Sequence, residues 1–240
     1  MDALEAHLQR QIEHSRSFFW HRTRWDAVAG ELAGDDFTLT DVGAGIGLVG
    51  EFLETSHPHA TYRFVEPLES LVAELEARFG AAANANGAGS YADSRYVTLL
   101  DVLEHIEDDS EFLADLSAKT APGTILIMTV PALNGLWSSW DVALGHYRRY
   151  DKRMIRQLFA QLPFEVREIS YLFPEMLPAA VARRRNRRVR QDAAAESETA
   201  EFPDLPRWLN ELLYRIGSAT RRARRLSPAG TSLLVVAERS

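Results

Sequence analysis

Three glycines, Gly43, Gly45 and Gly47, stand at two-residue spacing directly after a short apolar run at residues 37–42. Glycine lets a backbone turn tightly and approach a ligand, and a helix that starts after the turn presents unpaired N–H groups. The segment from Gly45 to Gly50 formally matches the dinucleotide pattern G-x-G-x-x-G. Its register is wrong for a dinucleotide loop, because the first glycine after the apolar run is Gly43. The pattern indicates a nucleotide-type loop without deciding which nucleotide it binds.

Two carboxylates accompany this loop. Asp41 lies two residues before the first glycine, where it can meet a cation through charge-assisted hydrogen bonds. An amino-acid ammonium group suits that position better than a pyrophosphate does. Glu66 ends the next alternating segment, roughly twenty residues on, from where a carboxylate can accept both ribose hydroxyls of an adenosine. NAD enzymes share this ribose contact, so Glu66 alone does not separate the cofactor classes.

His105 and His146 are the candidates for proton transfer, because imidazole side chains titrate near neutral pH and act as general bases. His105 follows an apolar run at residues 95–100, and His146 precedes a helix that Asp151 caps. The alternative interpretations are a structural role for His105 and stacking of His146 on a neighbouring tyrosine.

Asp101, Glu104 and His105 form an acid-x-x-acid-His cluster, which lies on one side of a helical turn if the segment forms one. Oxygen ligands with one imidazole can hold a divalent cation, which would lower the pKa of a catechol-like acceptor. The interpretation that we favour is helix capping and cofactor contacts. We therefore assign no metal ligands from the sequence.

Strands that alternate with helices must position these residues. Apolar or alternating runs predict strands at residues 37–42, 61–66, 81–86, 95–100, 124–130, 164–171 and 231–238, the third of them weak. Helical spacing predicts helices at residues 2–16, 18–32, 48–54, 68–79, 108–119 and from 151, and two more at 178–190 and 206–226. This order predicts an α/β fold with a mainly parallel sheet.

The motifs at residues 40–47, 65–67 and 99–109 resemble the successive motifs of class I S-adenosylmethionine-dependent methyltransferases. The similarity is greatest to the UbiE/UbiG-like small-molecule group, and the stretch Asp101-Val102-Leu103-Glu104-His105 is its most specific part. The similarity covers about residues 37–131, and a weaker similarity is found at residues 145–150. The resemblance implies a Rossmann-like, seven-stranded, mainly parallel sheet with helices on both faces and an antiparallel last strand.

The resemblance also implies S-adenosyl-L-methionine as the cofactor. The glycine loop would hold its methionine part, Asp41 would support its amino group, and Glu66 would take the ribose hydroxyls. Asn86 stands where the family often has an aspartate for the adenine amino group. The implied cofactor-binding residues are Asp41, Gly43, Gly45, Gly47, Glu66, Asn86, Leu100 and Asp101.

Aromatic and basic side chains are candidates for the acceptor side. The aromatic residues, which could cover the cofactor or simply fill the core, are Phe18, Phe19, Trp20, Trp25, Trp137 and Trp140. Arg148 and Arg149 could bind an anionic acceptor, or they could form ion pairs with acidic residues elsewhere in the chain.

The chain of 240 residues is long enough for one large domain. We expect a single domain with a helical lid at residues 1–34, a core at 35–173, a helical insertion at 174–230 and a final strand at 231–240. It has no cysteine, which excludes disulfides and thiol chemistry. The first 15 residues lack the pattern of a signal peptide, and no apolar run is long enough for a membrane span, so we expect a cytoplasmic protein.

Charge is divided unevenly along the chain. Residues 1–120 hold 22 acidic and 8 basic side chains, whereas residues 121–240 hold 12 and 19. Six arginines between Arg183 and Arg190 adjoin an apolar stretch, a pattern typical of peripheral contact with an anionic membrane. The alternative is a structural role, in which these arginines pair with acidic residues of the same chain. Net acidity and the absence of a recognition motif make nucleic acid an unexpected partner.

Three functions remain open at this point. The first is methyl transfer from S-adenosylmethionine to a small-molecule or lipid-linked acceptor. The second is a nicotinamide-dependent oxidoreductase, and the third is a non-catalytic binding module with a methyltransferase-like fold. The acceptor, the methylated atom and the oligomeric state do not follow from the residues.

Overall fold

A computed structural model of the chain describes residues 15–188 and 204–240, with backbone alone at residues 183–188. At the centre of the described part is a six-stranded sheet with the order β2-β1-β3-β4-β6-β5. The strands are β1 (Thr38–Val42), β2 (Thr61–Val65), β3 (Tyr96–Leu100), β4 (Ile125–Pro131), β5 (Phe164–Leu172) and β6 (Ser232–Arg239). The last strand runs antiparallel to both of its neighbours, β4 and β5, as expected. The remaining pairings are parallel.

The expectation of seven strands is wrong for the described chain, because residues 81–86 form no strand. Gly80, with φ of 86°, turns the chain into a 3-10 helix at Ala81–Ala83. Only Asn84 then makes an isolated parallel bridge with Phe64. Alanine side chains offer little surface for the cross-strand contacts that stabilise an edge strand, which is a physical reason for the difference.

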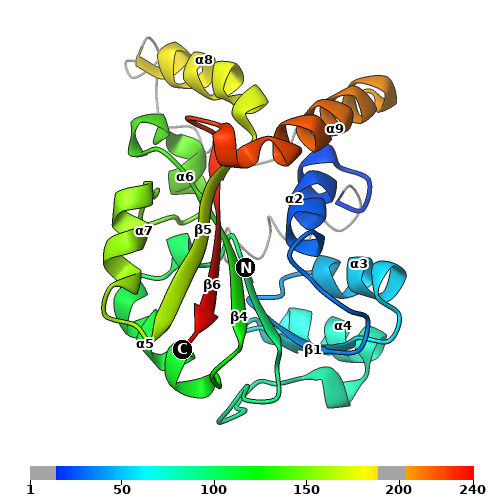
Figure 1. Ribbon diagram of the computed structural model, residues 1–240. Helices are drawn as coiled ribbons and strands as arrows, with labels where there is room; N and C mark the ends of the chain where they lie inside the picture. The colour runs from blue at the N-terminus through cyan, green and yellow to red at the C-terminus, as the bar shows by residue number, and fades with distance from the viewer. Residues whose placement is uncertain (1–14, 189–203) are drawn as a thin grey trace.

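Helices cover both faces of the sheet (Figure 1). The α-helices of the described residues are α2 (Phe19–Ala29), α3 (Leu48–Ser56), α4 (Glu69–Phe79), α5 (Asp109–Lys119), α6 (Ser139–Ala143), α7 (Lys152–Phe159), α8 (Leu177–Arg188) and α9 (Arg207–Arg222). Leu113 of α5 and Ile155 of α7 pack on one face, whereas Val28 of α2 and Leu53 of α3 pack on the other. Most of the predicted helices are therefore confirmed, although the short helix α6 was not expected.

Aspartate side chains begin two of these helices. Asp108 accepts a hydrogen bond from the Glu111 N–H at 3.0 Å, and Asp151 accepts one from the Met154 N–H at 2.8 Å. Each carboxylate satisfies a backbone donor that has no partner inside its helix. The cap predicted at Asp151 is confirmed, and Asp108 caps the helix that was predicted to begin at about residue 108.

The strand order reverses beside β1. The chain passes from β1 through α3 to β2 on one side, and β3 then pairs with β1 on the other. The loop after β1 and the loop after β3 therefore lead to opposite faces of the sheet, and a crevice forms between them. In open α/β sheets, this crevice is where ligands bind.

Helices α2, α8 and α9 lie at this end of the sheet (Figure 1). Asn210 of α9 accepts a hydrogen bond from the Phe19 N–H at 2.9 Å, and the Arg22 guanidinium lies 3.5 Å above the Tyr214 ring. The first and last parts of the described chain are therefore packed together over the crevice.

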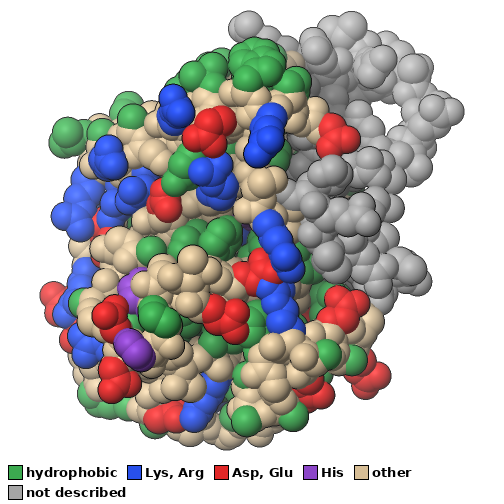
Figure 2. Space-filling view, turned by 90° about the vertical axis from the view of Figure 1, so that its right-hand side faces the viewer, with side chains coloured by type: hydrophobic (Ala, Val, Ile, Leu, Met, Phe, Trp, Pro, Cys, Tyr) green, Lys and Arg blue, Asp and Glu red, His purple; other side chains and the backbone are tan. Residues whose placement is uncertain are grey.

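Parts of two predicted helices lie outside the described residues. The helix predicted at residues 2–16 lies almost entirely in the undescribed N-terminal part, and the end of the helix predicted at 178–190 lies in the second undescribed segment. Among the described residues, no helix combines the length and apolar character that a membrane span needs. One face of the molecule carries hydrophobic side chains at the α9 end, with basic and acidic side chains beside them (Figure 2).

Candidate active site

A cavity of about 980 Å³ opens at the carboxyl ends of β1 and β3. The glycine loop and the segment after β3 form its two inner walls, and helices α2, α8 and α9 contribute to its cover. Nearly all the side chains and loop positions singled out from the sequence line it, namely Asp41, Gly43, Gly45, Glu66, Asn86, Leu100, Asp101, His105 and His146. Gly47 does not line it, because this residue is the N-cap of α3 and faces helix α4.

The glycine loop needs its glycines for conformation and for space. Gly43 has φ of 75° and Gly47 has φ of 77°, in the left-handed region that favours glycine. A Cβ atom at Gly43 would lie 2.5 Å from Val102, and one at Gly47 would lie 2.6 Å from Leu75. The glycines therefore let the loop lie close to the segment after β3 and to helix α4.

Glu66 is almost fully buried at the edge of the cavity. Its carboxylate accepts hydrogen bonds from the Gly45 N–H at 2.7 Å and the Leu68 N–H at 3.0 Å. Burial raises the pKa of Glu66, and these two hydrogen bonds oppose the shift. Asn86 holds the Glu66 backbone from both sides, since its amide oxygen accepts from the Glu66 N–H at 3.0 Å and its amide nitrogen donates to the Glu66 carbonyl at 2.9 Å. Asn86 thus positions Glu66 in addition to lining the cavity.

Asp41 lies beneath the glycine loop and is 2% exposed. Its carboxylate accepts hydrogen bonds from the Thr98 hydroxyl at 2.6 Å and the Tyr62 hydroxyl at 3.2 Å. Burial raises the pKa of Asp41 to about 6, against the opposing effect of those two hydrogen bonds. The charge of the Asp41 carboxylate therefore changes with pH around pH 6, close to the physiological range.

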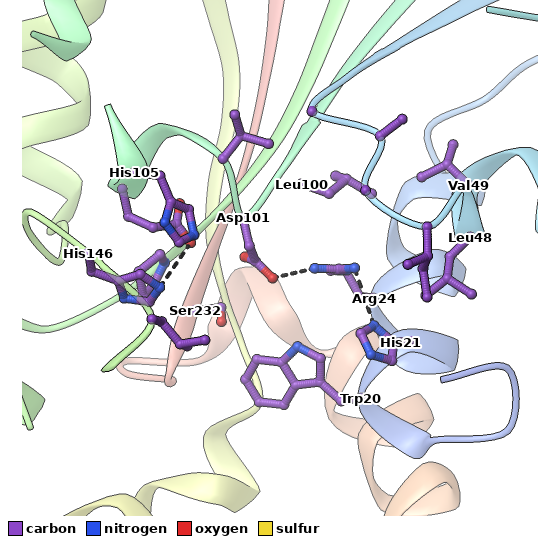
Figure 3. Close-up of a pocket in the computed structure, with 18 of the residues that line it drawn as sticks. Trp20, His21, Arg24, Leu48, Val49, Leu100, Asp101, His105, His146 and Ser232 are labelled. Carbon is purple, nitrogen blue, oxygen red and sulfur yellow. Dashed lines mark hydrogen bonds and ion pairs between the residues drawn. The ribbon is translucent and has the colours of Figure 1, made fainter. Parts of the chain in front are cut away.

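Asp101 stands at the end of β3 with φ of 58°, a conformation that non-glycine residues rarely adopt. Its side chain forms an ion pair with Arg24 of helix α2 and accepts a hydrogen bond from the Thr129 hydroxyl at 3.0 Å. Figure 3 shows Arg24 between Asp101 and His21, with a dashed line to each of them. The strained backbone and the ion pair together fix this carboxylate at the centre of the cavity.

The far wall holds both predicted histidines. The rings of His105 and His146 cross nearly at right angles with 4.8 Å between their centroids, and they lie on the same side of Asp101 (Figure 3). Nδ1 of His146 lies 3.1 Å from Asp141 Oδ1, and Nε2 lies 4.0 Å from Glu104 Oε1. Burial, reinforced by the negative charge of Asp101, raises the pKa of Glu104 well above its ordinary value.

The aromatic residues divide between cavity and core. Trp20 lines the cavity and stacks on Phe173 with 3.8 Å between ring centroids. Trp140 also lines it, as do Phe18 and Phe19. Trp25 instead stacks on Phe52 inside the core, and Trp137 is absent from the described cavity lining.

The two candidate arginines have different surroundings. Arg148 forms an ion pair with Asp109 at 2.6 Å, which matches the expected pairing with the acidic half of the chain. Arg149 lines the cavity, but its guanidinium donates to Asp141 at 2.7 Å and to the Ala132 carbonyl at 2.9 Å. Both arginines are therefore engaged within the protein.

Sequence reasoning missed Arg24 and Asp141. Arg24 follows Trp20 by four residues, so helical periodicity could have placed both on one face of α2. Asp141 follows Ser138 by three residues and completes a capping box there, with its carboxylate accepting from the Ser138 N–H at 2.8 Å. The spacing of Ser138 and Asp141 could have predicted the capping box, but no sequence pattern predicts the contact between Asp141 and His146.

Comparison with known proteins identifies the class. Residues 4–169, more than half of the chain, match a family described as a methyltransferase domain. The comparison with curated proteins found no match. A solved chain from the complex of the Haloferax volcanii Trm112 methyltransferase activator with its methyltransferase is 16% identical, with a TM-score of 0.62 over 100% of this chain and 98% of that chain.

Two further solved structures have the same fold. A Thermotoga maritima S-adenosylmethionine-dependent methyltransferase is 12% identical, with a TM-score of 0.62 over 99% of each chain. The geranyl diphosphate C-methyltransferase of Streptomyces coelicolor, solved with S-adenosyl-L-homocysteine, is 13% identical, with a TM-score of 0.57 over 91% of this chain and 80% of that chain. At these identities the likeness concerns the fold.

The chain belongs to the methyltransferase domain family, and it is a class I S-adenosylmethionine-dependent methyltransferase. This result favours methyl transfer over the nicotinamide oxidoreductase. The residues present fit the cofactor, because an open glycine loop and a buried carboxylate, Glu66, face one cavity. Bound S-adenosylmethionine supplies an electrophilic methyl group.

Proposed function

We propose that the protein transfers a methyl group to a hydroxyl oxygen of an apolar small-molecule or lipid-linked acceptor, and that it belongs to the UbiE/UbiG-like small-molecule group. The observation that carries this proposal is one continuous cavity with two chemically different ends. One end has the glycine loop and Glu66, and the other has Glu104, His105 and His146. Such an arrangement allows a nucleophile to be aligned with a cofactor held beside it.

The residues at the first end would hold the cofactor. Glu66 would accept the ribose hydroxyls, because its carboxylate is already fixed by two backbone N–H groups. Asp41 would balance the ammonium group of the methionine part, and Asn86 would keep Glu66 in place near the adenine. Leu100 and Asp101 would lie beside the cofactor at the end of β3.

The second end fits an acceptor with apolar surface. Outside the glycine loop, the cavity as a whole is lined mainly by side chains without charge, among them Trp20, Ile106, Phe112, Leu136, Trp140, Leu144, Met176 and Leu213. Removing apolar surface from water stabilises a bound acceptor by about 25 cal/mol per Å². Because Arg149 is engaged with Asp141, recognition of an anionic group is not the main feature of this end.

We assign the proton-accepting role to His146 in preference to His105, when the acceptor is a hydroxyl. Asp141 lies 3.1 Å from Nδ1 of His146, and a carboxylate there favours the tautomer with its proton on Nδ1. Nε2 is then available to take the acceptor proton. Although burial opposes it, His146 and Arg149 hold the pKa of Asp141 below its ordinary value, so Asp141 stays ionised in this arrangement.

We also propose that the helical insertion meets an anionic membrane. Helix α9 exposes Trp208, Leu212 and Ile216 at four-residue spacing, with exposed fractions of 69%, 46% and 38%. A helix with one exposed apolar face and adjoining basic residues can lie in a lipid interface. Two arginines that follow α9 are used inside the protein, because Arg224 and Arg225 both form ion pairs with Glu168.

Cofactor binding and methyl transfer test the proposed function directly. Calorimetry should show binding of S-adenosylhomocysteine and none of NAD(H). Radiolabelled S-adenosylmethionine, offered with phenols and catechols that do or do not carry an alkyl chain, should label the alkylated hydroxyl compounds best. Labelling of an amine or carbon acceptor in place of the hydroxyl compounds would contradict the oxygen assignment. Cofactor binding without transfer to any acceptor would instead support a binding module.

A further inference from the structure

Three side chains able to ligate a metal ion converge on the far wall of the cavity. Ligand atoms of Glu104, His105 and His146 all lie within 4.8 Å of one another. Glu104 and His105 come from the segment after β3, whereas His146 comes from the loop after α6. Ligand atoms around a tetrahedral zinc ion lie about 3.3 Å apart, given metal–ligand distances near 2.0–2.1 Å. Small side-chain rotations would therefore bring the three groups onto one ion.

This grouping differs from the cluster that the sequence suggested. Asp101 is turned toward Arg24 and Thr129, so it does not join Glu104 and His105. His146, more than forty residues later, takes its place. The ligand set changes from mostly oxygen to two imidazoles and one carboxylate. Imidazoles favour zinc, iron or cobalt over magnesium, which prefers oxygen ligands and water.

Glu104 provides an independent indication of a missing partner. The side chain is 1% exposed, and its Oε2 atom has no hydrogen-bond partner among the described residues. Its Oε1 atom lies 4.0 Å from His146 Nε2, which is beyond hydrogen-bond distance. A buried carboxylate oxygen without a partner costs free energy, and a bound cation would remove that cost.

The surroundings of His146 resemble the support that metal-binding histidines have. Asp141 is fully buried, lies 3.1 Å from His146 Nδ1, and is itself held by Arg149 Nε at 2.7 Å. A carboxylate on one ring nitrogen fixes the ring orientation and leaves the other nitrogen as a ligand. The Nε2 atom that remains is the one that faces Glu104.

We propose that Glu104, His105 and His146 bind a divalent transition-metal ion at the acceptor end of the cavity. Three protein ligands leave a coordination position open, as in catalytic zinc sites. An ion there would lower the pKa of an acceptor hydroxyl, so that the hydroxyl proton would pass to solvent water and His146 would act as a ligand and not as the base. This role in activating the acceptor rests on the proposed function, whereas metal binding itself does not.

Direct binding of Co²⁺ and Zn²⁺ to the full-length, tag-free protein tests the site. The protein is treated with chelator and titrated with Co²⁺ followed by visible absorption, and with Zn²⁺ followed by calorimetry. We expect one ion per chain, with affinity lowered at least about 100-fold in Glu104→Gln and His146→Ala. His105→Ala should lower it in the same way. His59→Ala, which changes an exposed histidine outside the cavity, is the matched control.

A measurement on the unmodified protein covers the case in which a variant fails to fold. In the wild-type protein, Zn²⁺ should shift the imidazole ¹⁵N signals of two histidines only. Absence of Co²⁺ and Zn²⁺ binding, or binding that only His59→Ala reduces, would overturn the proposal. Binding of Mg²⁺ in place of Zn²⁺ and Co²⁺ would overturn it too. S-adenosylhomocysteine binding, measured in parallel, reports on the proposed function separately.

Discussion

Arg24 of helix α2 forms an ion pair with Asp101 at the carboxyl end of strand β3, although 77 residues separate them in the chain. The side chains are 13% and 28% exposed, so the pair is partly withdrawn from water. It connects the helix that covers the cavity to the sheet that forms its floor (Figure 3). The covering helix is thereby anchored at the place where we propose that the cofactor binds.

The Arg24–Asp101 pair should show a measurable coupling energy. The changes in the free energy of unfolding caused by Arg24→Gln and Asp101→Asn should not add in the double variant. We expect the difference from additivity to be about 1–2 kcal/mol, which lies between the coupling energies of exposed and of buried ion pairs. Urea denaturation of the wild type, both single variants and the double variant measures this energy. Arg153→Gln, at an exposed position on α7, controls for loss of an arginine. Additive single effects would show that the ion pair contributes nothing to stability.

Glu66→Gln should weaken the binding of S-adenosylhomocysteine without unfolding the protein. The variant loses the charge of the carboxylate that we place on the ribose hydroxyls, and each charge-assisted hydrogen bond contributes about 1.5–3 kcal/mol. The dissociation constant should therefore rise at least about tenfold in calorimetry. Glu69→Gln, an exposed change three residues away, should leave it unaltered. Equal affinity of the two variants would remove Glu66 from the cofactor site.

His146→Ala should lower the methyl-transfer rate by about 10²–10⁴, with the affinity for S-adenosylhomocysteine retained. His105→Ala should have a smaller effect on the rate if His146 alone takes the acceptor proton. The assay uses the acceptor that the screen of phenols and catechols identifies, with His59→Ala as the control. If both variants keep wild-type turnover, alignment of the acceptor alone explains the catalysis, and neither histidine is the base.

Asp41 should make the protein less stable as pH rises. Its pKa is about 6 in the folded protein and 3.8 ordinarily, so the folded state binds the proton more tightly than the unfolded state. The resulting stabilisation is complete below about pH 4 and is lost as pH rises through about 6. The loss corresponds to about 3 kcal/mol, at 1.36 kcal/mol per pKa unit.

Asp41→Asn isolates this contribution, because the amide does not ionise. The free energy of unfolding of the variant, relative to the wild type, should rise by about 2 kcal/mol between pH 4 and pH 7. Urea denaturation across this range measures it, and Asp115→Asn at an exposed position of α5 is the control. A difference from the wild type that does not change with pH would mean that Asp41 stays ionised in the folded protein.

Contact of helix α9 with lipid should depend on both its apolar face and the neighbouring charges. We expect the protein to sediment with anionic vesicles and not with neutral ones, and salt should weaken this binding. Trp208→Ser with Leu212→Ser should reduce it, as should charge reversal at Arg183, Arg184 and Arg187. Val142→Ser removes an exposed apolar side chain on α6 and is the control. Failure to sediment with anionic vesicles at low salt would refute the membrane contact.

The sequence by itself determined the features that depend on local patterns. The glycine spacing, the acid two residues before it and the acid at the end of the next strand predicted the cofactor end of the cavity. Asp108 and Asp151 predicted two helix starts, and the alternation of strands with helices predicted the α/β fold. These signals are readable because turns, caps and hydrophobic periodicity act over a few residues.

Tertiary structure decided which distant residues meet. Arg24 meets Asp101 because α2 packs over the crevice, and Glu104 meets His146 because the loop after α6 returns to the segment after β3. Residues 81–86 do not form the predicted strand, because Gly80 turns the chain into a 3-10 helix at Ala81–Ala83 and small alanine side chains add little to cross-strand packing. Contacts of this kind depend on how whole elements pack and how long loops close, and no pattern within a few residues records that geometry.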